Sequence, residues 1–161
     1  MSSPFTSLTL GDALAAAGSP SVAFESMWQA LWTQQRVPAS LLELCRLRLA
    51  QLHGATAELE VQHPTAKVPA ARRASVIAGR FTADGQFTPG EVAVLSLAEV
   101  YAQDPAAITD TLADDVKAAY GDAGLIVLIE ALGFIDGRIR MARIANTLAT
   151  PAPEPIARAS I

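Results

Sequence analysis

The segment 41–54 constrains the fold of this chain more than any other feature of its sequence. Between Leu41 and Leu52 nearly every residue is a good helix former, and none is proline or glycine. Leucines recur around the whole helical projection and leave only narrow polar gaps, so we expect a helix that is buried on most sides. Two charged residues, Glu43 and Arg48, fall inside this apolar pattern. Because a buried charge is costly unless it is paired, each of them predicts a partner or a site.

Helix signals continue along the rest of the chain, and no convincing strand alternation is present. Pro64 should end one helix, and Thr88-Pro89-Gly90-Glu91 has the spacing of a capping box with proline at the first helical position. The expected helices besides the central one span about 8–17, 22–35, 55–62, 69–77, 89–103, 109–119 and 123–146. The prediction is an all-α fold, with one domain over residues 1–148 and a proline-rich, mobile tail over 149–161.

The composition predicts an assembly of several copies. Hydrophobic residues make up 51% of the 161 residues and charged residues 17%, and the mean hydropathy is +0.29. This is apolar for a soluble monomer of this size, so part of the apolar surface should be buried between subunits of a homo-oligomer. The aromatic-rich helix at 22–35 is expected to contribute to these contacts through Trp28 or Trp32.

Charge and cysteine content narrow the partners and the compartment. The net charge is −4 and the pI is near 5.1, which argues against nucleic acid or an anionic membrane as a partner. The longest uninterrupted apolar run, 123–129, falls well short of the ~20 residues of a spanning helix. A single cysteine excludes an intrachain disulfide and suits a reducing compartment. We therefore expect a soluble, cytoplasmic protein.

Several stretches of sequence resemble a known family. Leu42-Glu43-Leu44, the run Leu47-Arg48-Leu49-Ala50-Gln51-Leu52 and Gly54 are similar to the carboxymuconolactone decarboxylase and alkylhydroperoxidase D family. The resemblance returns in the segments 87–91, 97–99 and 120–123, and it covers about residues 20 to 148. It implies a helical domain of the alkylhydroperoxidase D-like type that forms homo-oligomers.

The family's redox motif is absent from the chain. In the thiol-active members, a glutamate on the central helix is followed by a Cys-x-x-Cys pair that opens the next helix, with a histidine four residues further on. Glu43 matches the glutamate, which the resemblance identifies as a proton relay. The positions of the two cysteines and the histidine hold Ala55, Glu58 and Gln62. The resemblance therefore implies the family framework without its thiol chemistry.

The candidate site residues each have a structural interpretation beside the functional one. Glu43 is either the family's relay carboxylate or a buried or partly exposed carboxylate held by a basic neighbour, and without its redox partners we favour the second. Cys45, on a leucine-rich helix, is more often an inert core residue than a reactive thiol. His63 lies one position beyond the family's histidine, and one helical step turns a side chain by about 100°. His53 could simply bind the carbonyl groups at the end of the central helix.

The remaining polar residues suggest ion pairs and no cofactor. His53, Glu58 and His63 are spaced five and five apart, which does not align metal ligands on one helical face, so no metal or other cofactor is expected. For Arg48 we predict Glu130 as the first partner and Asp136 as the second. Arg72-Arg73 should form an exposed, solvated turn.

Three classes of function remain open at this point, and whether the chain is an enzyme is not decided. The favoured one is a family member without peroxidase activity that acts as a binding or structural protein, with a possible small-molecule ligand near Glu43. The second is a non-redox enzyme of the family's decarboxylase type, in which Glu43, His53, Glu58 and His63 serve as acids and bases. The third is a vestigial antioxidant peroxidase that uses Cys45 with an external thiol.

Overall fold

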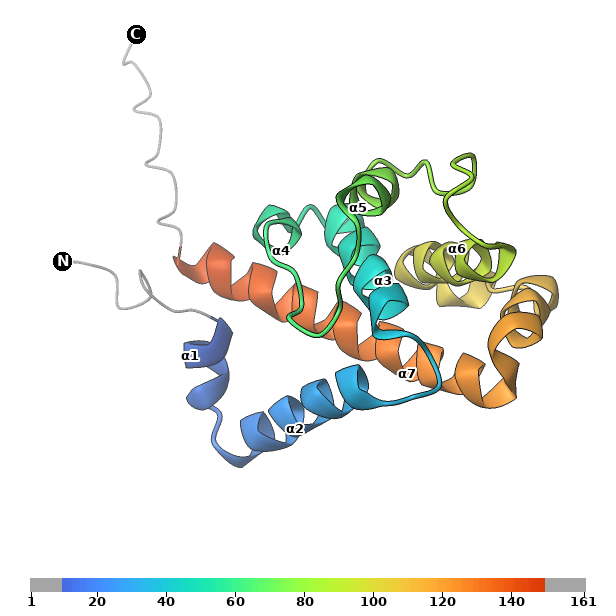
Figure 1. Cartoon of the computed structure of the whole chain (residues 1–161). Coiled ribbons are helices and arrows are strands. Elements are labelled where there is room, and N and C mark those ends of the chain that lie inside the picture. Colours follow the sequence, from blue (N-terminus) through green and yellow to red (C-terminus); the bar gives the residue numbers. More distant parts are fainter. Residues whose placement is uncertain (1–9, 150–161) are drawn as a thin grey trace, which may run out of the picture.

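The described part of the chain is built of helices alone, which are joined by turns and short loops (Figure 1). The computed structural model describes residues 10–149, and within these no strand is present. The elements are α1 (Leu10–Ala15), α2 (Ser19–Thr33), α3 (Ala39–Leu52), α4 (Thr56–Leu59), α5 (Ala70–Ile77), α6 (Pro89–Gln103), the 3-10 turn η1 (Pro105–Ala107) and α7 (Asp110–Ala149). Residues 150–161 of the predicted tail lie outside the described residues.

Helix α3 lies at the centre of the domain, as its sequence predicts. It packs against α2, α4, α5, α6 and α7, so neighbours surround it on most sides (Figure 1). Every residue from Leu41 to Leu47 is buried, which includes the two charged residues Glu43 and Arg46. A helix with this much buried surface fixes the positions of its polar groups, because neighbouring side chains leave them little room to move.

The start of α6 is built as the capping-box sequence predicts. The side chain of Thr88 accepts a hydrogen bond from the Glu91 backbone N–H at 3.2 Å, and Glu91 Oε2 accepts one from the Thr88 N–H at 2.9 Å. Gly90, in the same first turn of α6, lies against α7, where an added Cβ would be only 2.5 Å from the Cβ of Ala119. Glycine at this position therefore permits the close approach of α6 and α7.

Helix α7 is broken at Gly121, where the sequence predicts a separation between two helices. Gly121 has φ 71° and ψ 173°, a conformation that favours glycine.

By length and composition, Asp110–Ala145 is the one described helix that could cross a membrane, and 33% of its most apolar window is buried inside the domain. Leu128, Leu132 and Ile135 of this helix are fully buried core residues.

Helix α2 directs its two tryptophans into the core of the domain, which leaves them little surface for the subunit contacts expected from the sequence. Trp28 and Trp32 are 8% and 4% exposed, and their ring centroids lie 5.2 Å apart in an edge-on arrangement. The large apolar side chains that α2 leaves exposed are Val22 and Met27. The aromatic stripe therefore belongs to the core, and any contact of α2 with another copy would involve its other face.

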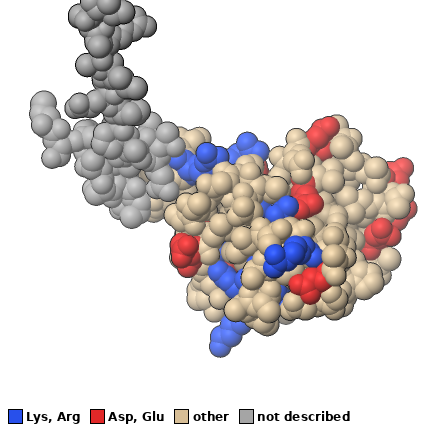
Figure 2. All heavy atoms as spheres, turned by 90° about the horizontal axis from the view of Figure 1, so that it is seen from above, with Lys and Arg blue, Asp and Glu red and all other residues tan. Residues whose placement is uncertain are grey.

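Figure 2 shows the charged side chains on one face of the described chain. Arginine and lysine side chains lie in several separate groups on this face, some of them next to acidic side chains, while other acidic side chains lie at its edge without a basic neighbour. This distribution is consistent with the negative net charge of the chain.

Candidate functional site

The candidate site is organised around a buried ion pair between Glu43 and Arg46, one turn apart on α3. Glu43 is fully buried and Arg46 is 4% exposed. Arg46 Nε donates to Glu43 Oε2, and Arg46 Nη2 donates to Glu43 Oε1, both at 2.8 Å. Such parallel bonds between a guanidinium and a carboxylate are among the strongest charge-assisted pairs in proteins. The interpretation of Glu43 as a buried carboxylate held by a basic neighbour thus agrees with its geometry.

A second arginine, from α5, completes the surroundings of Glu43. Arg73 Nη1 lies 3.4 Å from Glu43 Oε1, and the neighbouring Arg72 donates to Glu91 Oε1 at 2.6 Å. The prediction that Arg72 and Arg73 form a solvated turn is therefore wrong. Both side chains are mostly buried, because α5 packs directly against α3 and brings them to carboxylates of other helices.

All the hydrogen-bond donors of Arg46 are used. Besides its two bonds to Glu43, Nη1 donates to the Glu58 carbonyl at 2.8 Å and to Glu58 Oε2 at 3.0 Å, and Nη2 donates to the Val61 carbonyl at 2.7 Å. Burial lowers the pKa of Arg46, but hydrogen bonds and charges of Glu43 and Glu58 outweigh it and raise the pKa above its ordinary value. This guanidinium is a fixed structural cation with no donor left for a ligand.

These arginine contacts explain why α4 is shorter than predicted. The expected helix at 55–62 ends at Leu59. Arg46 binds the carbonyls of Glu58 and Val61, and Arg73 Nη2 donates to the carbonyl of Leu59 at 3.2 Å. These carbonyls accept hydrogen bonds from guanidinium groups of other helices, so they do not need the backbone N–H donors of a further helical turn. The argument from helical rotation therefore does not apply to His63, which lies in a non-helical segment.

A pocket of about 210 Å³ opens beside this ion-pair cluster. Its wall combines α2, α3, α4, the segment after α4 and α7. The lining residues are Trp28, Arg46, Glu58, Val61, Gln62, His63, Pro64 and Arg138. Of the residues predicted from sequence, the structure thus brings Glu58 and His63 to one pocket, with Glu43 buried behind Arg46.

Arg138 is the pocket residue whose hydrogen bonding is incomplete. Its guanidinium carbon lies 4.3 Å from the centroid of the Trp28 ring, within cation–π distance. Its Nη1 atom is buried and has no hydrogen-bond acceptor among the described residues. The Glu25 carboxylate is 3.8 Å away, beyond hydrogen-bond distance. Burial lowers the pKa of Arg138, although Glu25 and Glu58 oppose this.

His63 is held by stacking on an indole. Its ring lies 4.0 Å from the Trp32 ring with an interplanar angle of 11°, and its Nδ1 is 2.9 Å from Thr65 Oγ1. Burial lowers the pKa of His63, with Glu43 opposing this and Arg46 and Arg138 adding to it. The neutral imidazole is therefore favoured in the folded protein.

Cys45 has no access to the pocket or to solvent. It is completely buried in α3, and burial raises its pKa to about 12. A thiol with such a pKa is almost entirely protonated at neutral pH, and only the thiolate is a good nucleophile. The interpretation of Cys45 as an inert core residue agrees with this environment.

Two other positions that the sequence resemblance aligns with the redox motif, Ala55 and Gln62, also serve the structure. The Ala55 N–H donates to the Ala50 carbonyl at 2.8 Å at the turn after α3. The Gln62 side chain donates to the Ala66 carbonyl at 2.7 Å and holds the segment after α4. Neither residue can act as a nucleophile or as a proton shuttle.

His53 lies apart from the pocket that His63 lines. It closes the C-terminus of α3 and contacts Asp136 of α7, beside a different pocket. Among the described residues, no group of three His, Cys, Asp or Glu could hold a metal ion. The proposed acid–base set of four residues is therefore not assembled in one place.

Both predicted partners of Arg48 are wrong. Arg48 binds Glu99 of α6, with its Nε 2.6 Å and its Nη2 2.5 Å from Glu99 Oε1. Glu130 is exposed, and Asp136 binds His53. Arg48 is mostly buried, as expected, with 14% of its side chain exposed. The error arises because α3 turns this side chain towards α6, an orientation that helix periodicity alone cannot supply.

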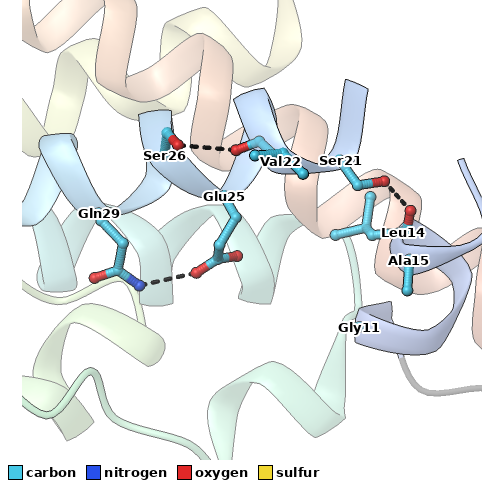
Figure 3. Close-up of a pocket in the computed structure, with 8 residues that line it drawn as sticks. All are labelled: Gly11, Leu14, Ala15, Ser21, Val22, Glu25, Ser26 and Gln29. Carbon is cyan, nitrogen blue, oxygen red and sulfur yellow. Dashed lines mark hydrogen bonds between the residues drawn. The ribbon is translucent and has the colours of Figure 1, made fainter. Parts of the chain in front are cut away.

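A wider groove of about 700 Å³ lies between α1 and α2 (Figure 3). Its polar groups bind one another: Gln29 donates to Glu25 at 2.8 Å, and Ser26 donates to the Val22 carbonyl at 2.9 Å. Ser21 likewise donates to the Leu14 carbonyl. This groove therefore presents mostly backbone and satisfied side chains, which gives it less binding chemistry than the pocket at Arg138.

Sequence reasoning did not identify the two most informative arginines. The spacing of Glu43 and Arg46, three residues apart on one helix, is a recognisable signal for an ion pair. No comparable signal marks Arg138, which reaches the pocket only because α7 passes beside α2.

Comparison of the chain with models of known protein families, with curated proteins and with solved structures finds no match.

Proposed function

We propose that this chain is a thiol-independent protein of the carboxymuconolactone decarboxylase and alkylhydroperoxidase D-like type that binds a small molecule and does not reduce peroxides. The family assignment rests on the sequence resemblance. The loss of redox chemistry is supported by Glu58, which occupies the position of the second family cysteine and is bonded to Arg46. It is also supported by the complete burial of Cys45.

The observation that carries the binding function is the incomplete hydrogen bonding of Arg138. A buried guanidinium N–H without an acceptor costs free energy, and a ligand oxygen in the pocket would remove that cost. Trp28 and Pro64 give the same pocket an apolar part. The ligand class that fits is a small organic acid, with its carboxylate on Arg138 and its apolar part against Trp28.

Tryptophan fluorescence tests this proposal, since the only two tryptophans of the chain lie at or next to the pocket. Cyclohexanecarboxylate is a suitable probe because it does not absorb where indole does, and its methyl ester is the uncharged control. We expect saturable quenching by the acid and about tenfold weaker binding in Arg138→Gln. The control variant Arg36→Gln changes an exposed arginine outside the pocket, and it should bind the acid as tightly as wild type does. Equal binding by acid and ester, or by Arg138→Gln and wild type, would reject the carboxylate assignment.

A second candidate function is a non-redox enzyme of the decarboxylase type. Glu58 and His63 line one pocket, and a carboxylate and an imidazole are the usual groups for acid–base catalysis. Glu43 is buried behind Arg46, and His53 lines a different pocket. Of the four predicted acid–base residues, only Glu58 and His63 therefore remain in this pocket. Release of carbon dioxide from a carboxylated lactone, abolished in His63→Gln, would favour this function over binding alone.

We also propose that the chain assembles into a homo-oligomer. The exposed large apolar residues include Val22 on α2 and Ile126 and Ile129 on α7, with 69%, 56% and 42% of their surfaces exposed. Exposed apolar side chains of this size favour contact with another protein surface. Sedimentation equilibrium should show a mass above 16.9 kDa and a shift towards the monomer in Ile126→Lys. A monomeric wild type would reject the proposal.

A further inference from the structure

The pocket at Arg138 contains polar groups besides the guanidinium to which the proposed carboxylate binds. Glu58, Gln62 and His63 line the same pocket. Each of these side chains binds the protein through one polar atom and has a second polar atom without a partner among the described residues. These second atoms bear on which groups a ligand carries besides its carboxylate.

The first of these atoms is Nε2 of His63, which is a hydrogen-bond donor. The backbone N–H of Thr65 donates to His63 Nδ1 at 3.4 Å, and Thr65 Oγ1 lies 2.9 Å from the same nitrogen. Because a backbone N–H can only donate, Nδ1 is an acceptor and Nε2 carries the hydrogen of the neutral ring. A protonated ring also carries a hydrogen on Nε2, so this nitrogen is a donor in either protonation state. No described residue accepts a hydrogen bond from it.

The other two atoms are acceptors. Glu58 Oε2 accepts from Arg46 Nη1 at 3.0 Å, whereas Glu58 Oε1 has no donor among the described residues. Gln62 Nε2 donates to a backbone carbonyl, which leaves its amide oxygen as an acceptor. Glu58 lies near enough to Arg138 to oppose the lowering of the Arg138 pKa by burial. An acceptor oxygen is therefore close to the guanidinium that would bind the ligand carboxylate.

A hydroxyl group next to the carboxylate of the ligand matches this arrangement. A carboxylate can only accept, so it cannot bind Glu58 Oε1, whereas a hydroxyl group can donate to Glu58 and accept from His63 Nε2. An ammonium group has no acceptor for His63, and Glu58 is already paired with the positive charge of Arg46. Trp28 and Pro64 remain for the hydrocarbon part of the ligand.

We propose that the ligand of this pocket is a small 2-hydroxy acid, and that His63 and Glu58 determine this specificity by binding its hydroxyl group. Arg138 binds the carboxylate, His63 Nε2 donates to the hydroxyl oxygen, and the hydroxyl group donates to Glu58 Oε1. This inference rests on the proposed function, because it takes the carboxylate on Arg138 as given.

Two acids of nearly equal shape test the inference. 1-Hydroxycyclohexanecarboxylate and 1-methylcyclohexanecarboxylate differ by a hydroxyl group in place of a methyl group, and each is titrated into the protein while tryptophan fluorescence is followed. We expect the hydroxy acid to bind about tenfold more tightly. Equal binding of the two acids would overturn the inference and leave the proposed function intact, whereas binding of neither acid would reject both. Tighter binding of 1-aminocyclohexanecarboxylate than of the hydroxy acid would overturn the hydroxyl group in favour of an ammonium group.

The variant His63→Phe separates hydrogen bonding from ring stacking. Phenylalanine retains a flat ring beside Trp32, whose ring lies 4.0 Å from that of His63, but it has no N–H donor. Its preference for the hydroxy acid should fall to about threefold or less. The midpoints of the titrations are compared, because a substitution beside Trp32 changes the starting fluorescence.

Two arginine variants are the controls for this preference. Arg138→Gln should weaken the binding of both acids and keep the preference between them, and the exposed Arg36→Gln should keep both the affinity and the preference. An undiminished preference for the hydroxy acid in His63→Phe would overturn the assignment of the hydroxyl group to His63.

Discussion

Arg46 and Arg138 line the same pocket but differ in their hydrogen bonding. Arg46 is 4% exposed and places all its donors on Glu43, Glu58 and two backbone carbonyls. Arg138 lies over Trp28, and its buried Nη1 has no acceptor among the described residues. Burial alone therefore does not identify a functional charge. The guanidinium of Arg46, whose N–H donors all have acceptors, supports the fold. The guanidinium of Arg138, which has an N–H donor without an acceptor, is available to a ligand.

The largest expected effect is the loss of stability in Arg46→Met. The substitution leaves Glu43 as a buried charge with only a long contact to Arg73, and breaking a buried pair in this way costs about 3–5 kcal/mol. Urea denaturation measures the change in the free energy of unfolding. The double variant Glu43→Leu/Arg46→Met should recover part of the loss, because no unpaired carboxylate remains. A loss below about 1 kcal/mol in the single variant would place Arg46 among the weak surface pairs.

Arg48→Met should have an intermediate effect. Arg48 pairs with Glu99, but 14% and 28% of the two side chains are exposed, so water can partly replace the lost bonds. Loss of such charged hydrogen bonds costs about 1–3 kcal/mol. The same denaturation experiment applies, with Glu130→Gln as the control, since Glu130 is exposed and is not the partner. If Glu130→Gln were as destabilising as Arg48→Met, the observed pairing would be incorrect.

Arg138→Gln should change stability little and binding strongly. The guanidinium has no strong ion pair to lose, and its contact with Trp28 is worth about 1 kcal/mol or less at a partly exposed site. Thermal unfolding checks the stability, and the fluorescence titration checks the binding. A loss as large as that of Arg46→Met would show that the two arginines play the same structural role.

The smallest effect is a pH dependence that arises from His63. Its pKa is lowered in the folded protein, so the unfolded chain takes up the proton first as the pH falls through about 6.5. Its contribution to stability is therefore complete above pH 6.5 and is lost progressively below it. Unfolding at pH 7.5 and 5.5 should show a larger loss at low pH in wild type than in His63→Gln. An equal loss in both proteins would contradict this assignment.

Local sequence signals predicted the helices better than they predicted the pairings. The capping box at Thr88 and the buried character of α3 depend on neighbouring residues in the chain, and both are observed. The partner of Arg48 depends on which helix packs against α3, and there the prediction was wrong. The predicted length of α4 was wrong for the same reason, because Arg46 and Arg73, on other helices, bind its last carbonyls.

The sequence predicted the candidate site in part. As for the helices, the features that depend on neighbouring residues were predicted, and those that depend on helix packing were not. Glu43 was identified because a charge in an apolar helix requires a partner, and this requirement is local. Glu58 and His63 were placed in the right segment, but His53 was grouped with them although it lines a different pocket. Arg138 was missed because its role depends on the approach of α7 to Trp28.

Hydroperoxide consumption in the presence of dithiothreitol tests most directly whether this chain lacks thiol-dependent peroxidase activity. Burial raises the pKa of Cys45 to about 12 and so keeps its thiol protonated at neutral pH, and no second thiol is present to resolve a sulfenic acid. Wild type and Cys45→Ser should therefore both consume hydroperoxide at the uncatalysed rate. Turnover well above that rate in wild type that disappears in Cys45→Ser would contradict the account and make Cys45 the active thiol.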